Sequence, residues 1–300
     1  MRSTNPIMTA LGLITVSMVI IGFIDNYVRV IAEEAGLWQF HAVRAVMVLP
    51  ILAAVIWARG LDWRPKRVWA VSLRSFVIAI SMYLYFGALG VMPAAVAGAG
   101  LFTSPIWVLI ITVLVFRAPV GIWRILAVAV GFGSVLLILN PGSSALGWSA
   151  MMPITAGAFY AAGAVMTRRM CDGETTSALL VNMFTTMGVF GFIGLSIMTF
   201  YVRGDTFFTA PWRGLSETFL WLTLMQAVGS LIAVACIVRS YQIADASYVA
   251  VFEYLFLLFA VIWGYVLWQD LPSAVGFLGI ALIIGAGAVI VLRSARMDDA

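Results

Sequence analysis

The chain has 300 residues, of which 63% are hydrophobic and only 10% charged. Soluble proteins carry roughly 25% charged residues, so this composition excludes a soluble globular domain and indicates a polytopic membrane protein. The net charge of +4 is typical of basic cytoplasmic loops in such a protein, and no nucleic-acid partner is expected.

Ten apolar stretches are long enough to cross a lipid bilayer as α-helices, which takes about 20 residues each. Charged residues, glycine, proline or asparagine bound them. In chain order the expected spans are 7–28, 38–58, 69–89, 94–116, 120–139, 147–168, 177–201, 217–239, 247–268 and 273–292. The runs are continuous and lack the alternation of a membrane barrel, so the predicted fold is all-α.

Lysine and arginine predict the orientation of these spans. With the N-terminus in the cytoplasm, thirteen of the basic residues fall on or near the inner side, and four (Arg29, Arg44, Arg203 and Arg213) fall on the outer side. Because basic residues favour cytoplasmic loops, both termini are predicted to be cytoplasmic.

The two halves of the chain resemble each other most near their ends. A shift of 153 residues brings Pro119 onto Pro272, and one further residue brings Gly131 onto Gly285. The shift of 153 residues also brings Gly100 onto Glu253. The spacing of proline and glycine therefore predicts an internal repeat.

Each repeat contains five spans, with residues 1–142 as the first and 143–300 as the second, inside one membrane domain. Because five is odd, the second repeat enters the membrane with the opposite orientation. Inverted repeats of this kind are the architecture of alternating-access transporters, with the substrate site near mid-membrane between the repeats.

Specific residues carry a resemblance to a known family. An alanine-rich stretch is followed by a mid-helix proline, a short turn and then arginine and glycine: Pro105, Arg124, Gly131, Phe132, Gly133 and Pro141-Gly142. The run VFEYLFLLFAVIWGYVLWQDLP at 251–272 provides a second match. On these residues the chain resembles the drug/metabolite transporter superfamily, and within it the ten-helix EamA type.

The resemblance implies a ten-helix secondary transporter of the bacterial inner membrane, in which helices one to four and six to nine surround a central cavity. Amino-acid exporters are prominent among similar proteins. The chain departs from the family where relatives often end spans four and nine with Gly-Glu; here these positions read VFRAP and WQDLP. That departure weakens any transfer of a particular substrate.

Glu253 is a carboxylate well inside an apolar span. Ionisable groups inside a membrane are costly and mark functional sites by default. Three partners stay open for it: the ammonium group of a substrate, a proton, or the Arg74 guanidinium, which enters the third span from the same side.

Aromatic rings with a polar tip suit a pocket for a largely apolar solute. The candidates for substrate contact on the cavity helices, besides Glu253, are Asn26, Tyr83, Trp107, Tyr160, Gln226, Phe252 and Tyr254. Tryptophans at the predicted span ends are better explained by the interfacial belt.

Asp25 and Arg44 lie at comparable depth near the outer side, and we expect them to pair as an outer gate. Metal and cofactor sites are not expected, because His41 is the only histidine and the two cysteines, Cys171 and Cys236, lie far apart. The small residues of AVAGAG at 95–100 favour close helix approach.

The leading hypothesis is a monomeric secondary transporter, bound to no partner but its small-molecule substrate and the bilayer, that exports neutral or aromatic amino acids. The alternative is an uptake or exchange carrier for another metabolite, such as a vitamin, a nucleoside-like or a drug-like solute. A membrane-embedded enzyme or a channel is a remote alternative, since paired catalytic groups are missing from the spans and inverted repeats are unusual in channels.

Overall fold

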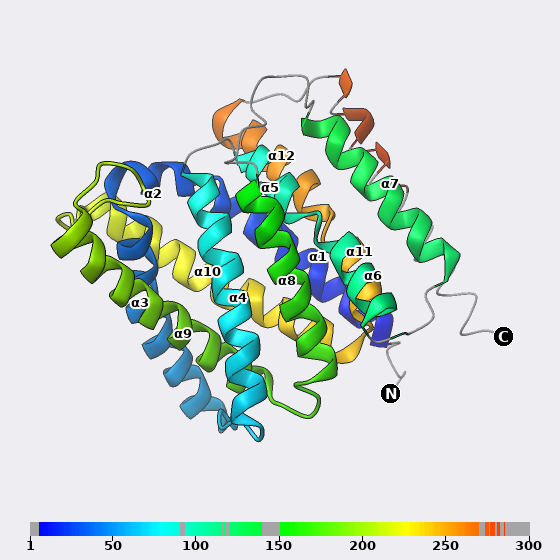
Figure 1. Ribbon diagram of the computed structural model, residues 1–300, viewed down its shortest axis with the longest axis horizontal. Helices are drawn as coiled ribbons and strands as arrows, with labels where there is room; N and C mark the ends of the chain where they lie inside the picture. Colours follow the sequence, from blue (N-terminus) through cyan, green and yellow to red (C-terminus); the bar gives the residue numbers. More distant parts are fainter. Residues whose placement is uncertain are drawn as a thin grey trace.

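The computed structural model describes residues 6–90, 94–115, 117, 121–139 and 151–269, together with 274–275, 277–279, 281–282 and 285. Within these residues every regular element is a helix (Figure 1). The tenth expected span, 273–292, lies largely outside them, so the ten-helix arrangement stays a prediction.

The first half of the chain begins with a long apolar helix that ends near Asn26. Its helices are α1 (Pro6–Asp25), α2 (Val28–Glu34), α3 (Leu37–Arg59), α4 (Val68–Leu89), α5 (Ala94–Leu101), α6 (Ser104–Leu114) and α7 (Ile122–Leu139). Gly60 ends α3 with a φ of 59°, a left-handed conformation that glycine adopts without a steric penalty.

The second half repeats the pattern of long helices followed by a broken one. Its helices are α8 (Met151–Arg169), α9 (Thr176–Ile197) with a π-helical turn (Met198–Val202), α10 (Glu217–Ile243), α11 (Ala246–Phe252) and α12 (Leu255–Trp268). The Thr175 and Ser216 side chains cap the N-termini of α9 and α10 by accepting backbone N–H bonds, which satisfies donors that a helix leaves free.

Six helical segments of the described chain are long and apolar enough to cross a membrane. They are Pro6–Glu34, Leu37–Arg59, Val68–Leu89, Thr176–Val202, Glu217–Ile243 and Val249–Trp268. The protein is therefore a polytopic membrane protein, as its composition predicts.

Two expected spans are not continuous helices. The span at 94–116 breaks at Phe102-Thr103 between α5 and α6, and the span at 247–268 breaks at Glu253-Tyr254 between α11 and α12. At the first break Pro105 lies in the first turn of α6, where its missing N–H costs nothing. At the second break the Phe256 N–H donates to the Glu253 carbonyl at 3.0 Å, which is a tighter, three-residue spacing.

The helices of the two halves pack in matched pairs. α1 packs along α10 and α4 packs along α8, while α3 packs along α9 (Figure 1). α1 also contacts α12, and α8 correspondingly contacts α5 and α6. When corresponding helices of the two halves are exchanged, the α1–α10 pair becomes the α8–α4 pair, and the α1–α12 pair becomes the α8–α6 pair. The α3–α9 pair becomes itself.

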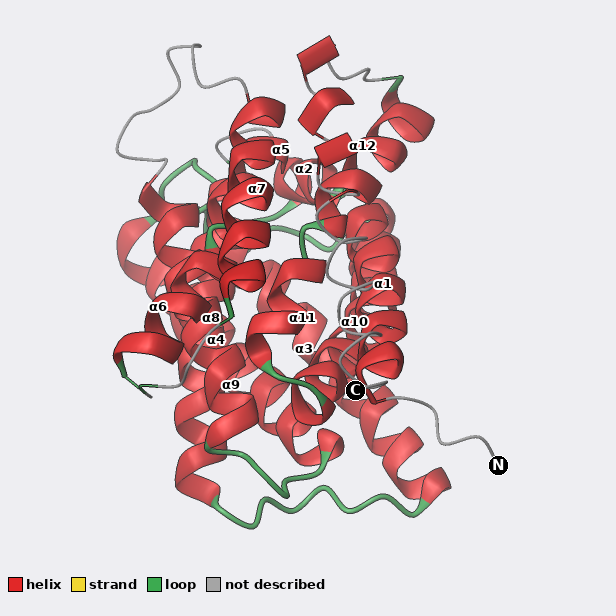
Figure 2. Cartoon of the chain, turned by 90° about the vertical axis from the view of Figure 1, so that its right-hand side faces the viewer, coloured by secondary structure: helices red, strands yellow, loops and turns green. Residues whose placement is uncertain are grey.

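Connections that are predicted to share a membrane side do lie together. The Glu174 carboxylate, between α8 and α9, accepts the backbone N–H groups of Lys66 and Arg67, between α3 and α4. Figure 2 shows these connections at the same end of the helices. Which end faces the cytoplasm stays a prediction.

At the opposite end, the segment 203–216 between α9 and α10 covers the first half. The Phe207 carbonyl accepts the Leu37 N–H at 2.8 Å, and the Phe208 carbonyl accepts the Trp38 indole N–H at 2.8 Å. The two phenylalanine rings lie where a Cβ at Gly90 or Gly87 would stand. This segment, the covering loop, thus attaches the second half to the first.

Candidate functional site

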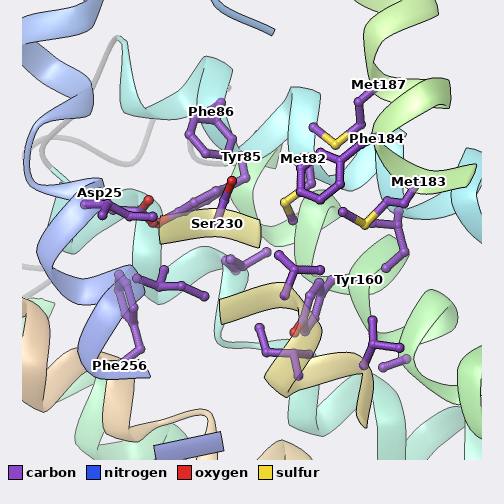
Figure 3. Close-up of a pocket in the computed structure, with 18 of the residues that line it drawn as sticks. Asp25, Met82, Tyr85, Phe86, Tyr160, Met183, Phe184, Met187, Ser230 and Phe256 are labelled. Atoms are coloured by element: carbon purple, nitrogen blue, oxygen red, sulfur yellow. The ribbon is translucent and has the colours of Figure 1, made fainter. Parts of the chain in front are cut away.

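A central cavity lies among the helices of both halves. Its empty space is about 950 Å³, counting the part open to solvent. Side chains from α1, α3, α4, α8, α9, α10 and α12 line it, together with Leu101 and Phe102 at the α5–α6 break (Figure 3). These elements belong to the spans that the resemblance assigns to the cavity.

The cavity walls are mostly apolar. Methionines contribute from three helices: Met18, Met82, Met183 and Met187. Figure 3 shows the last three gathered with Phe184 on one side of the cavity. Methionine is flexible and polarisable and makes favourable contacts with aromatic rings, so such a wall can adapt to a large, flat solute.

Two phenylalanines from the two helix breaks meet at this cavity. The rings of Phe102 and Phe256 are stacked with their centroids 4.8 Å apart, and both line the cavity. The broken helices of the two halves are therefore in direct contact where the cavity lies.

Asp25 forms one polar corner of the cavity at the end of α1. The Tyr85 hydroxyl donates to Asp25 Oδ2 at 3.0 Å, and the Gln226 side-chain N–H donates to the Ile24 carbonyl at 2.7 Å. Asp25, Tyr85 and Gln226 all line the cavity. The Gln226 Oε1 atom is buried without a hydrogen-bond partner.

Arg44 also lines the cavity but is held by other groups. Its guanidinium contacts His41 Nδ1 at 3.1 Å and lies 5.0 Å from the ring centroids of both Phe40 and Phe86. The Arg44 guanidinium and the Asp25 carboxyl group lie close enough to interact electrostatically, and their pairing as an outer gate stays a prediction.

Arg74 lines the cavity on α4. Its Nε–H donates to the Thr167 hydroxyl at 2.9 Å, and a terminal N–H donates to the Leu179 carbonyl at 3.5 Å. The guanidinium is buried, with 3% of its residue exposed. Its hydrogen bonds therefore go to α8 and α9, and none goes to Glu253.

Glu253 is fully buried at the break between α11 and α12. The Tyr160 hydroxyl donates to Glu253 Oε1 at 2.6 Å, while Oε2 has no hydrogen-bond partner. The Tyr241 hydroxyl lies close enough to interact with the carboxyl group but has no partner of its own. Tyr160 and Tyr241 line the cavity, whereas Glu253 stands behind them.

Five other candidates predicted from the sequence are absent from the cavity lining. The Tyr83 hydroxyl donates to the Met187 carbonyl, and Asn26 donates to the carbonyls of Gly22 and Ala260. Trp107 is half-buried against the core that contains Phe252 and Tyr254. In this structure these five side chains make hydrogen bonds within the protein or pack in its core. Their contact with a solute stays a prediction.

Several lining residues were not singled out from the sequence. The methionines look like ordinary core residues, and Tyr241 falls beyond the expected end of the span at 217–239. The helix continues to Ile243, which brings Tyr241 to the cavity. Among the described residues, no group of three or more His, Cys, Asp and Glu side chains could hold a metal ion.

Comparison with known proteins gives the cavity a context. The model of the EamA-like transporter family matches residues 8–140 and again residues 147–292. The chain belongs to the EamA-like transporter family. Family membership and the relatives of this EamA-like protein indicate a transporter rather than an enzyme.

Three relatives of this EamA-like protein have names that state what they transport. A riboflavin transporter of Rhizobium johnstonii is 25% identical over 89% of this chain and 83% of its own length. A riboflavin transporter of Vibrio cholerae is 26% identical over 81% and 78%. A pseudopaline exporter of Pseudomonas aeruginosa is 26% identical over 71% and 72%.

A crystal structure of another protein has the same fold as this EamA-like chain. The TM-score is 0.78 with 15% identity, and the match covers 97% of this chain and 99% of the other. At that identity the likeness concerns the fold alone.

Proposed function

We propose that the protein is a secondary transporter that moves a flat, mostly apolar organic solute through the central cavity by alternating access. The carrying observation is the cavity itself, whose walls come from both halves and are mostly apolar, with methionine, phenylalanine and aliphatic side chains beside a smaller number of polar ones. Sites for small ligands are mainly apolar, with a few polar groups that orient the ligand.

Riboflavin is our first candidate solute. Its ring system is planar and aromatic, with one edge that carries hydrogen-bonding groups. Flat faces suit the methionine wall, and the polar edge suits the corner of the cavity where Asp25, Tyr85 and Gln226 lie. Two relatives named riboflavin transporters, each aligned over more than three quarters of both chains, support this choice.

Export of neutral or aromatic amino acids is the second candidate. The observation that favours it is the presence of Asp25 and Arg44 in the lining of one cavity. A carboxylate and a guanidinium can bind the ammonium and carboxylate groups of a zwitterion. The stacked Phe102 and Phe256 rings would contact an aromatic side chain.

Alternating access rests on the proposed two-repeat architecture. The matched helix pairs, the two family-model matches and the break in the fourth helix of each half support it. Broken helices near the membrane midplane are typical of inverted-repeat transporters.

A binding and flux experiment separates the two solutes. Purified protein in detergent is titrated with riboflavin, whose fluorescence reports binding, and with tritiated phenylalanine. Proteoliposomes loaded with unlabelled solute are then tested for exchange of the labelled one without ATP. The proposal predicts saturable binding and exchange of riboflavin. Saturable exchange of phenylalanine alone would favour the second candidate, and unsaturable flux of both would refute a transporter.

Two variants sharpen this experiment. Asp25→Asn removes the charge that a zwitterion needs, so it abolishes phenylalanine binding but weakens riboflavin binding only modestly. Glu217→Gln, an exposed change at the start of α10, is the matched control and leaves both unchanged. Equal loss of riboflavin binding in both variants would indicate misfolding instead of a site effect.

The proposed location is the bacterial inner membrane, with the protein as a monomer and both termini in the cytoplasm. A cytoplasm-active reporter and a periplasm-active reporter, each fused after Ala300, test the orientation. Activity of the cytoplasmic reporter alone is expected. Light scattering of the purified protein, corrected for detergent, tests the monomer.

A further inference from the structure

Glu253 is the buried carboxyl group that the proposed solute site does not use. The sequence leaves it three partners: an ammonium group of a solute, Arg74 or a proton. The geometry around the α11–α12 break discriminates among them.

Arg74 does not neutralise Glu253. Its hydrogen bonds are made to Thr167 and to the Leu179 carbonyl, and the group that donates to Glu253 is the neutral Tyr160 hydroxyl. In this structure the Arg74 guanidinium is thus bonded to α8 and α9, and Glu253 is bonded to a neutral group.

A solute in the cavity does not reach Glu253 either. The cavity is bounded on this side by Tyr160 and Tyr241, and Glu253 is fully buried behind them. A solute as large as an amino acid would have to displace a tyrosine whose hydroxyl is bonded at 2.6 Å. A proton needs no such space.

The hydrogen bonds of Glu253 fit a neutral carboxylic acid. An ionised carboxylate accepts several hydrogen bonds and is costly to bury without them, yet Oε2 has no partner and the nearby Tyr241 hydroxyl is also unpartnered. A proton on Oε2 supplies a donor that the Tyr241 oxygen can accept. Either this acid or the Tyr241 hydroxyl can donate within the pair, but only the protonated acid leaves no charge at a fully buried position.

Among the described side chains, none of the hydrogen bonds to the Glu253 carboxyl group comes from a cation. Tyr160 of α8 and Tyr241 of α10 face the carboxyl group, Tyr254 follows it on its own segment, and Arg74 of α4 acts on Tyr160. The helix α6 carries no titratable residue, and α1 carries only Asp25. The side chain of Arg124 on α7 is outside the described part of the chain.

We propose that Glu253 is a proton-binding site placed at the break of the ninth span, separated from the solute cavity by Tyr160 and Tyr241. In the state described here it holds a proton. When α8 moves relative to α11 and α12, the Tyr160 hydroxyl leaves Oε1, water reaches the carboxyl group, and the proton is released as the side chain changes from neutral to negative. The link to solute movement rests on the proposed transport function.

Infrared difference spectroscopy tests the proton without any solute. The spectrum of the wild-type protein in liposomes at neutral pH minus that of Glu253→Gln should contain the C=O stretch of a neutral carboxylic acid. A difference spectrum with carboxylate bands alone would overturn the proposal. Tyr241→Phe should shift the acid band, because the hydroxyl facing Oε2 is removed; an unshifted band would place the proton elsewhere.

Transport in proteoliposomes tests the coupling, with riboflavin as the probe. A gradient of one pH unit should change the accumulation ratio about tenfold for one proton per solute. We expect this response in the wild type and in the exposed control Glu217→Gln, and a ratio near one in Glu253→Gln. An equal response in Glu253→Gln overturns the coupling, as does a wild type that exchanges riboflavin without any response to the gradient.

The two experiments keep the two proposals apart. If the wild type moves no solute, the transport proposal fails, while the infrared band still decides whether Glu253 holds a proton. A thermal unfolding midpoint of Glu253→Gln close to that of the wild type establishes that this variant is folded.

Discussion

The two breaks in the helices of this protein fall in the fourth expected span of each half but are filled differently. At the first, Gly100 packs on Pro153 of α8, and a Cβ on Gly157 would lie within 3.0 Å of the Gly100 and Leu101 carbonyls and of Thr103 Oγ1. At the second break, the Glu253 carboxyl group accepts a hydrogen bond from Tyr160, which also belongs to α8.

A break in a membrane-spanning helix can therefore serve two purposes in one protein: close packing of helices, or the placement of a buried carboxyl group. Small residues let α8 approach the α5–α6 break directly. We call this break a packing joint, meaning a place where two helices are in close contact through Gly100 and Gly157. At the α11–α12 break a carboxyl group and two tyrosines take the place of the glycines. The position aligned with Gly100 is thus where the chain holds a buried ionisable group.

The largest expected effect is at the first break. Gly157→Ala should destabilise the protein by about 1–3 kcal/mol, the usual cost of overpacking, because the new methyl group meets backbone atoms that cannot rotate away. Unfolding in mixed detergent micelles measures it. Gly12→Ala is the matched control: nothing lies within 4 Å of its Cβ, so stability should be unchanged or slightly increased. Equal effects would mean that the first break is not a packing joint.

A smaller effect is expected from the helix that covers the second break. Gly131→Ala places a Cβ against the Tyr254 ring, whose side chain can shift where a backbone cannot. We expect a loss of about 1 kcal/mol, at the lower end of the overpacking range, measured by the same unfolding. A loss larger than that of Gly157→Ala would reverse our ranking of the two breaks.

Tyr160→Phe tests the charge state at the second break. A hydrogen bond between neutral groups contributes about 1 kcal/mol, and one to a charged group about 1.5–3 kcal/mol. With a neutral Glu253, we expect a loss of about 1 kcal/mol in the free energy of unfolding. A loss above about 2 kcal/mol would point to an ionised carboxylate and contradict the proton-binding site.

Tyr85→Phe should have the smallest effect. It removes the hydrogen bond to Asp25, but Asp25 lines the cavity, where water can replace the hydroxyl. The expected loss is below about 0.5 kcal/mol, at the lower limit for one hydrogen bond. An equal loss of stability in Tyr85→Phe and Tyr160→Phe would mean that the hydrogen bonds to Asp25 and to Glu253 contribute alike. The contrast between an acid in the cavity lining and an acid buried behind it would then be wrong.

Much of the fold follows from the sequence because lipid-spanning helices need length and apolarity above all. The spans expected at 38–58 and 69–89 correspond closely to Leu37–Arg59 and Val68–Leu89. The span expected at 217–239 was ended at Arg239, yet the helix continues to Ile243. Arg239 is exposed, and its charge does not end the helix.

The helix breaks were less accessible to prediction. Pro105 indicates the first break. The second break, at Glu253-Tyr254, contains neither proline nor glycine and has no local signal in the sequence; only its contacts with α8 and α10 distinguish it. In the cavity, Asp25, Arg44, Arg74, Tyr160 and Gln226 could be chosen because polar groups are rare in apolar spans. The methionines could not, because their chemistry is the same in a core and in a cavity wall.

The covering loop, finally, is bonded to the start of α3 through backbone groups of its own. The carbonyls of Phe207, Phe208 and Arg213 accept hydrogen bonds from α3 and its first residues, and the Arg213 N–H donates back to Gln39. Side-chain identity at most loop positions is irrelevant to these bonds. Two side chains of the loop do matter for its position, because the Phe207 and Phe208 rings lie where a Cβ at Gly90 or Gly87 would stand. A side chain at either glycine would therefore displace the loop from α3.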